Sequence, residues 1–213
     1  MGAELRMEQP EEGPSRSLGD SIVGWIREAL ETVLPALLIV LVVNLFLAQA
    51  TRVEGQSMEP NIENNQRLVV EKVSYHIHMP ERGDIVVLKP PNWRTVRLDQ
   101  RVLSWFCTVL PLDCAVDTPD PLIKRVIALP GETIEIRDGY VYIDGQLLSE
   151  PYLQQATYGT LAPRVISPGH VFVLGDNRGA SNDSRSFGEV ALSNIIGKAW
   201  LRYWPLNEMG VLR

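Results

Sequence analysis

An apolar run without any charged side chain covers residues 33–50. At about 1.5 Å per residue, a helix of this length extends roughly 27 Å, close to the roughly 30 Å hydrocarbon core of a bilayer. A buried helix of a soluble domain can also be apolar, but an uncharged run of this length would be unusual there. The run therefore predicts a transmembrane anchor helix over residues 33–50.

The same run could instead be the core of a cleavable secretory signal, because Ala48-Gln49-Ala50 has the small-x-small pattern of a cleavage site. Such cores span only about 7–15 apolar residues, however, and follow a short basic segment. Here the preceding segment, residues 1–32, is long and acidic. An uncleaved anchor is therefore favoured.

The segment before the anchor has two parts. Residues 1–17 are rich in Glu, Pro, Gly and Ser, a composition typical of disorder. Residues 18–31 place apolar side chains at helical spacing. This second part could lie along the membrane interface with Trp25 as an anchor, or it could extend the anchor helix on its aqueous side.

After residue 50 the pattern changes to short β-rich segments separated by turns. Asp138-Gly139 and Asp144-Gly145 lie between runs of alternating polarity, which is a strong hairpin signal over residues 133–148. The other strand candidates are residues 67–72, 84–89, 170–174 and 195–203. Together these segments predict a mainly β fold, with an antiparallel β domain over residues 51–213 that follows the anchor.

Residues 90–121 interrupt this regularity with several prolines and both cysteines. The apolar part, residues 102–110, is too short to span a bilayer and is either a core strand or an edge near the membrane interface. Cys107 and Cys114 could form a disulfide in an oxidising compartment, or they could be two free, buried thiols. Both possibilities stay open, because the sequence does not give their geometry.

The charge of the chain argues against a nucleic-acid ligand, and the spacing of its candidate metal ligands argues against a metal site. The net charge is −6 at pH 7, and no basic stripe of the kind found in nucleic-acid binders is visible. His76 and His78 would share a face on a strand, but no carboxylate or cysteine lies at a useful spacing for a metal site. We therefore expect no nucleic-acid partner, no metal and no other cofactor.

Three polar segments carry the candidate chemistry. The first is Gly55-Gln56-Ser57-Met58-Glu59-Pro60, the second is the segment 123–132 with Lys124 near its start, and the third is the loop 175–185. Each has an ordinary explanation when taken alone. A loop serine, a lysine that reaches solvent along its aliphatic stem and a polar turn are all common surface features.

In combination and order, these segments closely resemble those of the type I signal peptidase family. The resemblance also includes residues 82–87 (Arg-Gly-Asp-Ile-Val-Val), and it covers most of residues 33–204. It implies a membrane-bound serine endopeptidase that removes signal peptides from exported preproteins by cutting after small residues. In such an enzyme Ser57 maps to the nucleophile and Lys124 to its general base.

The resemblance also implies supporting roles. The Ser181 hydroxyl maps to a group that orients the lysine, and Asp183 and Arg185 map to an ion pair that braces the site. A lysine acts as a base only when neutral, so its pKa must fall by roughly 3.4 units from the reference value to operate near pH 7. Burial can cause a shift of that size. Candidate walls for the apolar pocket are Met58, Val126 and Ile127.

The sequence indicates the donors of the oxyanion hole less clearly than it indicates the nucleophile and the base. The main-chain N–H of Ser57 is the first candidate donor. Some relatives carry a serine hydroxyl two positions before the nucleophile. Here Gly55 occupies that position, so the sequence does not identify a second donor for the oxyanion hole. Asn61-Ile62 and Ala128 also depart from the residues that are common in the family.

By the same resemblance, the N-terminus is cytoplasmic and the catalytic domain lies on the outer face of an export membrane. Membrane lipid and exported preproteins are then its partners, with the export translocon nearby. Two alternatives use the same residues differently. One is a self-cleaving Ser/Lys protease of repressor type, which normally carries a DNA-binding domain. The other is a tethered β domain that binds a partner without catalysis.

Overall fold

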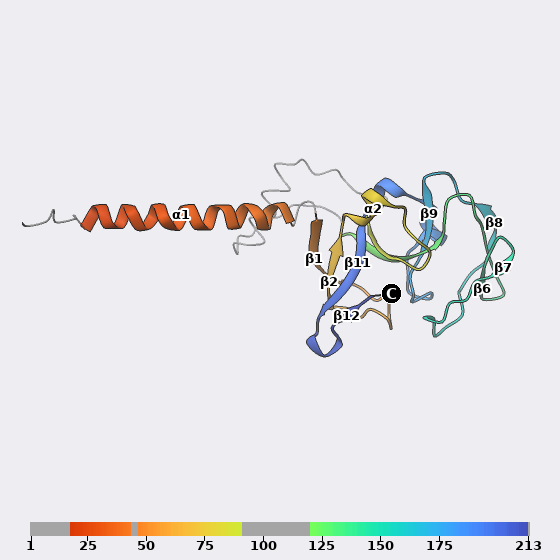
Figure 1. Ribbon diagram of the computed structural model, residues 1–213. Coiled ribbons are helices and arrows are strands. Elements are labelled where there is room, and N and C mark those ends of the chain that lie inside the picture. The colour runs from red at the N-terminus through yellow and green to blue at the C-terminus, as the bar shows by residue number, and fades with distance from the viewer. Residues whose placement is uncertain (1–17, 44–46, 91–119, 213) are drawn as a thin grey trace, which may run out of the picture. The chain divides into compact units, whose positions relative to one another are not determined.

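The computed structural model describes residues 18–43, 47–90 and 120–212. The chain forms two compact units that divide between Leu41 and Val42. The predictions for residues 1–17, and those for Cys107 and Cys114, lie outside the described residues. Figure 1 shows a long helix in the first unit and a β domain in the second.

The first unit contains helix α1 (Leu18–Val42), which is continuous through Pro35. The two segments that the sequence separates at residue 32 are therefore one helix, as expected if the first simply extends the second. Its apolar side chains are widely exposed, with Leu34 at 62% and Ile39 at 63%. Within residues 18–43, 47–90 and 120–212, no helix has the combined length and hydropathy that a membrane span needs.

The structure differs from the sequence prediction at the end of the apolar run. Residues 48–50, assigned above to the anchor helix, lie in strand β1 (Ala48–Arg52). This strand pairs antiparallel with β2 (Arg67–Glu71), and Ala50 lies opposite Val69. The cleavage-like sequence Ala48-Gln49-Ala50 is therefore part of a hydrogen-bonded ladder, which its composition alone did not reveal.

The second unit is built on two antiparallel sheets. The larger has eight strands in the order β1-β2-β11-β3-β4-β9-β10, with β12 paired to β11. Its remaining strands are β3 (Ile85–Leu88), β4 (Leu122–Ala128), β9 (His170–Leu174), β10 (Val190–Ala191), β11 (Ile195–Trp204) and β12 (Gly210–Val211). The prediction of a mainly antiparallel β fold is thus confirmed.

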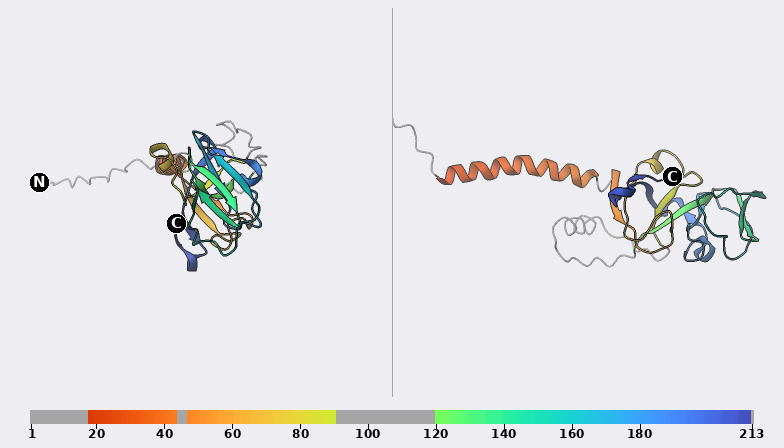
Figure 2. Two further views of the ribbon diagram at one scale, coloured as in Figure 1. Left: turned by 90° about the vertical axis from the view of Figure 1, so that its right-hand side faces the viewer. Right: turned by 90° about the horizontal axis from the view of Figure 1, so that it is seen from below.

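The smaller sheet has four strands in the order β7-β6-β5-β8. They are β5 (Thr133–Arg137), β6 (Tyr140–Ile143), β7 (Gln146–Leu147) and β8 (Leu161–Val165). The predicted hairpin forms, because Asp138-Gly139 turns β5 into β6 with positive φ at both residues. Figure 2 shows this sheet at the end of the unit away from β1.

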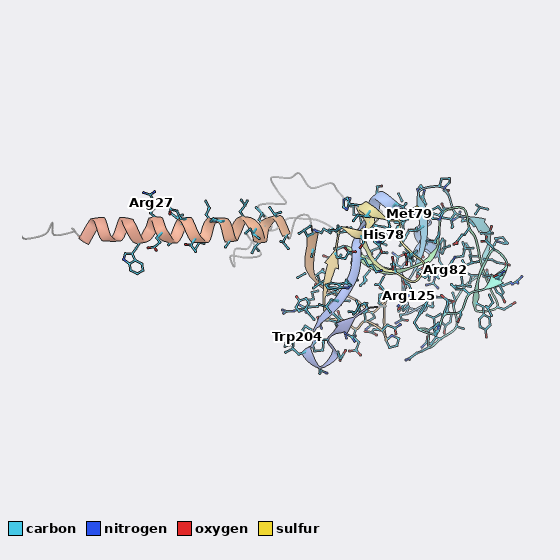
Figure 3. The ribbon with its side chains drawn as sticks, in the orientation of Figure 1. Arg27, His78, Met79, Arg82, Arg125 and Trp204 are labelled. Carbon is cyan, nitrogen blue, oxygen red and sulfur yellow. The ribbon has the colours of Figure 1, made fainter. Side chains whose placement is uncertain are left out.

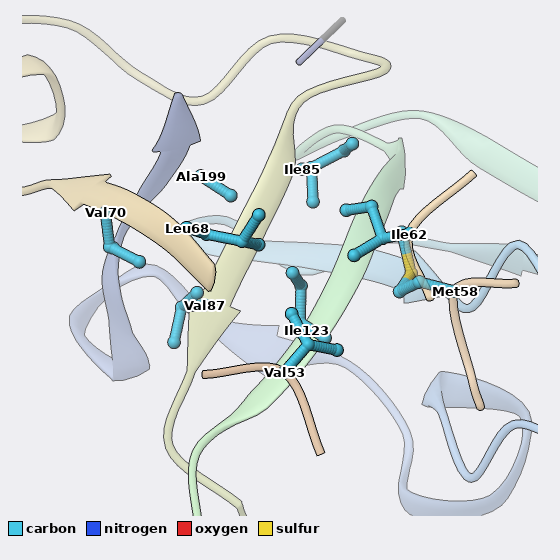
Figure 4. Packing of buried hydrophobic residues seen from close by; sticks show 9 residues of the cluster. All are labelled: Val53, Met58, Ile62, Leu68, Val70, Ile85, Val87, Ile123 and Ala199. Carbon is cyan, nitrogen blue, oxygen red and sulfur yellow. The ribbon is translucent and has the colours of Figure 1, made fainter. Parts of the chain in front are cut away.

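Short helices connect the strands near the functional loops. They are α2 (Ser74–Ile77), α4 (Ser184–Phe187), and the 3-10 turns η2 (Leu192–Asn194) and η3 (Leu206–Glu208). Strand β4 lies at the centre of the core, since it contributes Ile123, Val126 and Ile127 to three different clusters of buried apolar side chains. Figure 4 shows the cluster around Ile123, which includes Met58 and Ile62. The strand that carries Lys124 is therefore held on all sides by packed side chains.

The close approach of β2 and β11 at Gly197 yields a stability prediction. A Cβ at this position would overlap the carbonyl oxygen of Glu71 and lie 3.0 Å from Val70 Cγ1. Because backbone cannot move aside cheaply, Gly197→Ala should lower the free energy of unfolding by about 1–3 kcal/mol. Gly210→Ala is the matched control, since its Cβ would meet open space. Chemical denaturation checks both, and equal stability of the two variants would contradict the close approach.

Candidate active site

Ser57 lies in a tight turn that follows β1. Gly55 has a φ of +96°, which favours glycine, and the N–H of Glu59 donates to the carbonyl of Gln56 at 3.2 Å. Met58, the residue after the serine, is 1% exposed and packs in the cluster of Figure 4. The turn is thus anchored by an apolar side chain while the neighbouring Ser57 remains partly exposed.

Lys124 points from β4 toward this turn. Its Nζ lies 2.7 Å from Ser57 Oγ and donates to the carbonyl of Ile123 at 2.7 Å. The side chain is 2% exposed. Burial lowers the pKa of Lys124 to about 8, although Asp183 and Asp176 partly oppose this shift. A neutral amine that donates to Ile123 can still turn its lone pair to the serine hydroxyl.

The three side chains predicted to wall the lysine pocket belong to three different clusters of buried apolar residues. Met58 shares its cluster with Ile123 and Ile62. Val126 and Ile127, which were also predicted to line the pocket, belong to the two other clusters, and their place beside the lysine stays a prediction.

The main-chain donors of the turn are not equivalent. The N–H of Gly55 is already bonded to Asn64 Oδ1 at 3.1 Å. The N–H of Ser57 has no acceptor within the described residues. The carbonyl of Ser57 accepts from the N–H of Asn177 at 3.0 Å. Ser57 therefore offers a free donor beside its own hydroxyl, while Gly55 does not.

Asp183 and Arg185 form the predicted ion pair. Arg185 Nε and Nη2 donate to the two carboxylate oxygens of Asp183, each at 2.8 Å, and the N–H of Gly175 donates to the same carboxylate at 3.0 Å. Burial opposes ionisation, but the Arg185 guanidinium and the Gly175 N–H hold the pKa of Asp183 below its usual value. The carboxylate is fully buried and therefore fixed in orientation.

Ser181 also lies at the site. A Cβ at Gly175 would overlap both Ser181 Oγ and the carbonyl of Ser57, so these three residues are in close contact. The Ser181 hydroxyl is near enough to Asp183 to help lower its pKa, yet it has no hydrogen-bond partner among the described residues. The bond from Ser181 to Lys124 that the resemblance implies is not formed here, and that role stays a prediction.

A buried ion pair between Arg125 and Asp176 was missed by the sequence reasoning. Arg125 Nε and Nη2 donate to the two oxygens of Asp176, each at 2.8 Å, and the side chains are 3% and 1% exposed. The guanidinium carbon of Arg125 lies over the Tyr152 ring, 4.1 Å from the ring centroid. Figure 3 shows Arg125 inside the β domain. The only signal in the sequence was a charge within an apolar strand, which requires a partner.

A second buried pair joins the same loop to the segment after β7. Arg178 bonds to the carboxylate of Glu150 and to the hydroxyl of Thr157. The Tyr152 hydroxyl donates to Glu150 Oε1 at 2.7 Å. Residues 150–157 were not singled out by the sequence, yet they brace the loop that carries Asp176.

The histidines are placed differently from the expectation of a shared strand face. His76 lies in α2, and its Nδ1 is 2.6 Å from the carbonyl of Lys72. His78 follows the helix, and its Nδ1 contacts the carbonyl of Met79 (Figure 3). Among the residues that the structure describes, no group of three or more His, Cys, Asp or Glu is arranged to hold a metal ion.

Comparison with known proteins identifies the family. A family model described as signal peptidase, peptidase S26, matches residues 26–204. The chain belongs to this family. It is 39% identical over 188 residues to a probable signal peptidase I-1 of Synechocystis, covering 88% of this chain and 87% of that protein. It is 38% identical over 187 residues to a signal peptidase I of Leptolyngbya laminosa, covering 88% and 84%.

A solved signal peptidase I from Enterococcus faecalis is 29% identical, covers 57% of this chain and 97% of its own, and superposes with a TM-score of 0.41. Family membership and the relatives make the chain a signal peptidase I enzyme, a protease that removes signal peptides. Its substrates are therefore preproteins that carry such peptides.

The lowered pKa of Lys124 predicts the pH dependence of this peptidase. In the general-base role that the resemblance implies for Lys124, only the neutral amine takes a proton, so kcat/KM should rise with pH and level off above an apparent pKa of about 8. Below about pH 7 it should fall roughly tenfold per pH unit. Initial rates of cleavage of a synthetic signal-peptide substrate between about pH 6 and pH 10 test this. A flat profile across that interval would contradict it.

Arg185 provides a second test of the electrostatics. Replacing it in Arg185→Met leaves the charge of Asp183 uncompensated near Lys124, which should raise the lysine pKa. The rising limb of the pH profile should then move to higher pH, with lower activity at pH 7. Arg164→Met, at an exposed position of β8, is the control and should leave the limb in place. An unmoved limb in Arg185→Met would argue against this compensation.

Proposed function

We propose that this peptidase is a membrane-bound Ser/Lys endopeptidase that removes signal peptides from exported preproteins by cutting after small residues. Ser57 is the nucleophile and Lys124 its general base. The observation that carries this proposal is the 2.7 Å distance between Lys124 Nζ and Ser57 Oγ, at a lysine that is 2% exposed. An ordinary surface lysine would be charged and hydrated, and it could not accept a proton from serine near neutral pH.

In the first step, neutral Lys124 takes the hydroxyl proton as Ser57 Oγ attacks the scissile carbonyl carbon. The carbonyl oxygen gains negative charge, and the free N–H of Ser57 is positioned to donate to it. When the tetrahedral intermediate collapses, the C–N bond breaks and the Lys124 ammonium gives its proton to the leaving amine. The signal peptide is then an ester on Ser57.

In the second step, water attacks the ester while Lys124, neutral again, takes one of its protons. The second intermediate expels Ser57 Oγ, which recovers its proton from the lysine. The products are the mature protein with a free amine and the signal peptide with a free carboxylate. One base therefore serves both halves of the reaction, which requires a pKa near the working pH.

The preference for small residues at the first and third positions before the cut comes from the family resemblance. The buried side chains beside Ser57 are consistent with it, since Met58 and Ile62 are packed to near-zero exposure. In this proposal, shallow pockets beside Ser57 accept small side chains such as alanine.

The proposed anchor is the part of the uncharged run of residues 33–50 that precedes β1, with the N-terminus cytoplasmic and the β domain on the outer face of an export membrane. It is supported by the apolar side chains that α1 exposes and by the short stretch of chain between residue 50 and Ser57. On the β domain, Leu206 and Met209 are also exposed, at 70% and 62%, as is Trp204, at 50% (Figure 3 labels Trp204). Lipid contact and proximity to the translocon belong to this proposal.

Replacement of the two residues tests the chemistry. Ser57→Ala and Lys124→Met should each reduce cleavage of a preprotein in detergent by about a thousandfold or more, because the nucleophile or its base is removed. Lys124→Arg should be equally inactive, because arginine stays protonated. The controls are Ser193→Ala, at an exposed position of η2, and Lys89→Met.

An acylating serine probe separates the proposal from its alternatives. The probe should label wild type at Ser57 and should label Lys124→Met much more slowly. Retained cleavage by purified Ser57→Ala would remove the serine mechanism. Cleavage by folded wild type without labelling of Ser57 would argue against Ser57 as the nucleophile.

A further inference from the structure

Asn61 connects the Ser57 turn to the buried ion pair beside the base. Its Nδ2 donates to Asp176 Oδ2 at 2.9 Å and to the carbonyl of Tyr152 at 3.0 Å. Both hydrogens of the amide group are thus engaged at a partly buried position. The residue is one of those at which this chain departs from the common family pattern.

These contacts close a ring of interactions around the reactive pair. Lys124 is followed on β4 by Arg125, which holds both oxygens of Asp176 at 2.8 Å. The Asp176 carboxylate accepts a hydrogen bond from the Asn61 side chain. The backbone then connects Asn61 to Ser57. The ring closes at the 2.7 Å contact between Ser57 Oγ and Lys124 Nζ. The ring therefore links the end of the Ser57 turn to the residue that follows Lys124 on β4.

The same loop holds the turn at both of its ends. The N–H of Asn177 donates to the carbonyl of Ser57 at 3.0 Å, while the neighbouring Asp176 carboxylate binds the side chain of Asn61. On the other side, Arg202 Nη1 donates to the carbonyl of Asn61 at 3.3 Å. Two adjacent residues of a rigid loop thus fix the beginning and the end of the Ser57 turn.

The chemistry of the asparagine suits this place. Its amide is neutral and supplies two donors to two acceptors. A threonine hydroxyl supplies only one hydrogen. An aspartate would supply none and would place a second negative charge against Asp176, whose oxygen is 2.9 Å from the amide nitrogen. Alanine would leave the carbonyl of Tyr152 and one contact of Asp176 unmatched.

We propose that Asn61 is a positioning residue, which holds the Ser57 turn against Asp176 and thereby keeps the serine hydroxyl within reach of Lys124. This inference rests on the proposed Ser/Lys mechanism. Misplacement of a reacting group by about 1 Å can cost roughly a hundredfold in rate. Since the Asn61 side chain binds Asp176 and Tyr152, its loss should slow the chemical step and leave substrate binding nearly unchanged.

The test compares Asn61→Ala, Asn61→Thr and Asn61→Asp with wild type. In Asn61→Ala, kcat for a synthetic signal-peptide substrate should fall about 10- to 100-fold, with KM changed less than about threefold. Asn61→Thr should recover part of the loss, and Asn61→Asp should be the slowest. Asn194→Ala is the matched control, because that exposed side chain makes no hydrogen bond within the described part of the chain.

Acylation by a serine probe distinguishes positioning from loss of folded protein. A positioning role predicts slower labelling of Asn61→Ala with full final stoichiometry, whereas partial unfolding would lower the stoichiometry. Wild-type kcat in Asn61→Ala, a rise in KM alone, or a loss that tracks stoichiometry would overturn the inference. In each of these cases, loss of activity in Ser57→Ala would still uphold the proposed function. An inert, folded wild type would overturn both.

Discussion

The removal of the Lys124 amine from water is the constraint on which the rest of the site depends. A fall in pKa from 10.5 to about 8 corresponds to roughly 3 kcal/mol of differential stability between its charged and neutral forms. Burial of the lysine on β4, where it is 2% exposed, produces this effect. The nearby carboxylates of Asp183 and Asp176 act in the opposite direction. Arg125 and Arg185 pair with Asp176 and Asp183, and the positive charges of these arginines offset the effect of the carboxylates on the lysine.

Much of the fold could be predicted from local pattern. Alternating polarity and Asp-Gly turns gave the hairpin of β5 and β6 almost to the residue, and β9 was predicted with its observed ends. The strand at Ala48–Arg52 was missed, because its composition continues the preceding apolar run. What makes it a strand is pairing with β2, a non-local interaction that periodicity cannot reveal.

For the site, the family resemblance indicated Ser57, Lys124 and the Asp183–Arg185 pair. The two residues of this ion pair are only two positions apart in the sequence. The partners that were missed are distant along the chain. Arg125 and Asp176 are 51 residues apart, and Asn61 and Asp176 are 115 residues apart. No spacing rule links such residues, so only the three-dimensional arrangement reveals that they form one network. The sequence therefore indicated the residues proposed to carry out the chemistry more readily than the residues that hold them in place.

The alternation of side chains along β4 has a consequence for how the enzyme matures. Lys124 and Arg125 are neighbours on one strand, and the pleat sends one toward Ser57 and the other toward Asp176. A slip of β4 by a single residue in one direction would place Arg125 at the position of Lys124. The serine would then face a guanidinium, which does not give up its proton. In the proposed mechanism, misregistered folding intermediates are therefore inert, and hydrolytic competence begins only when the central strand has reached its native alignment.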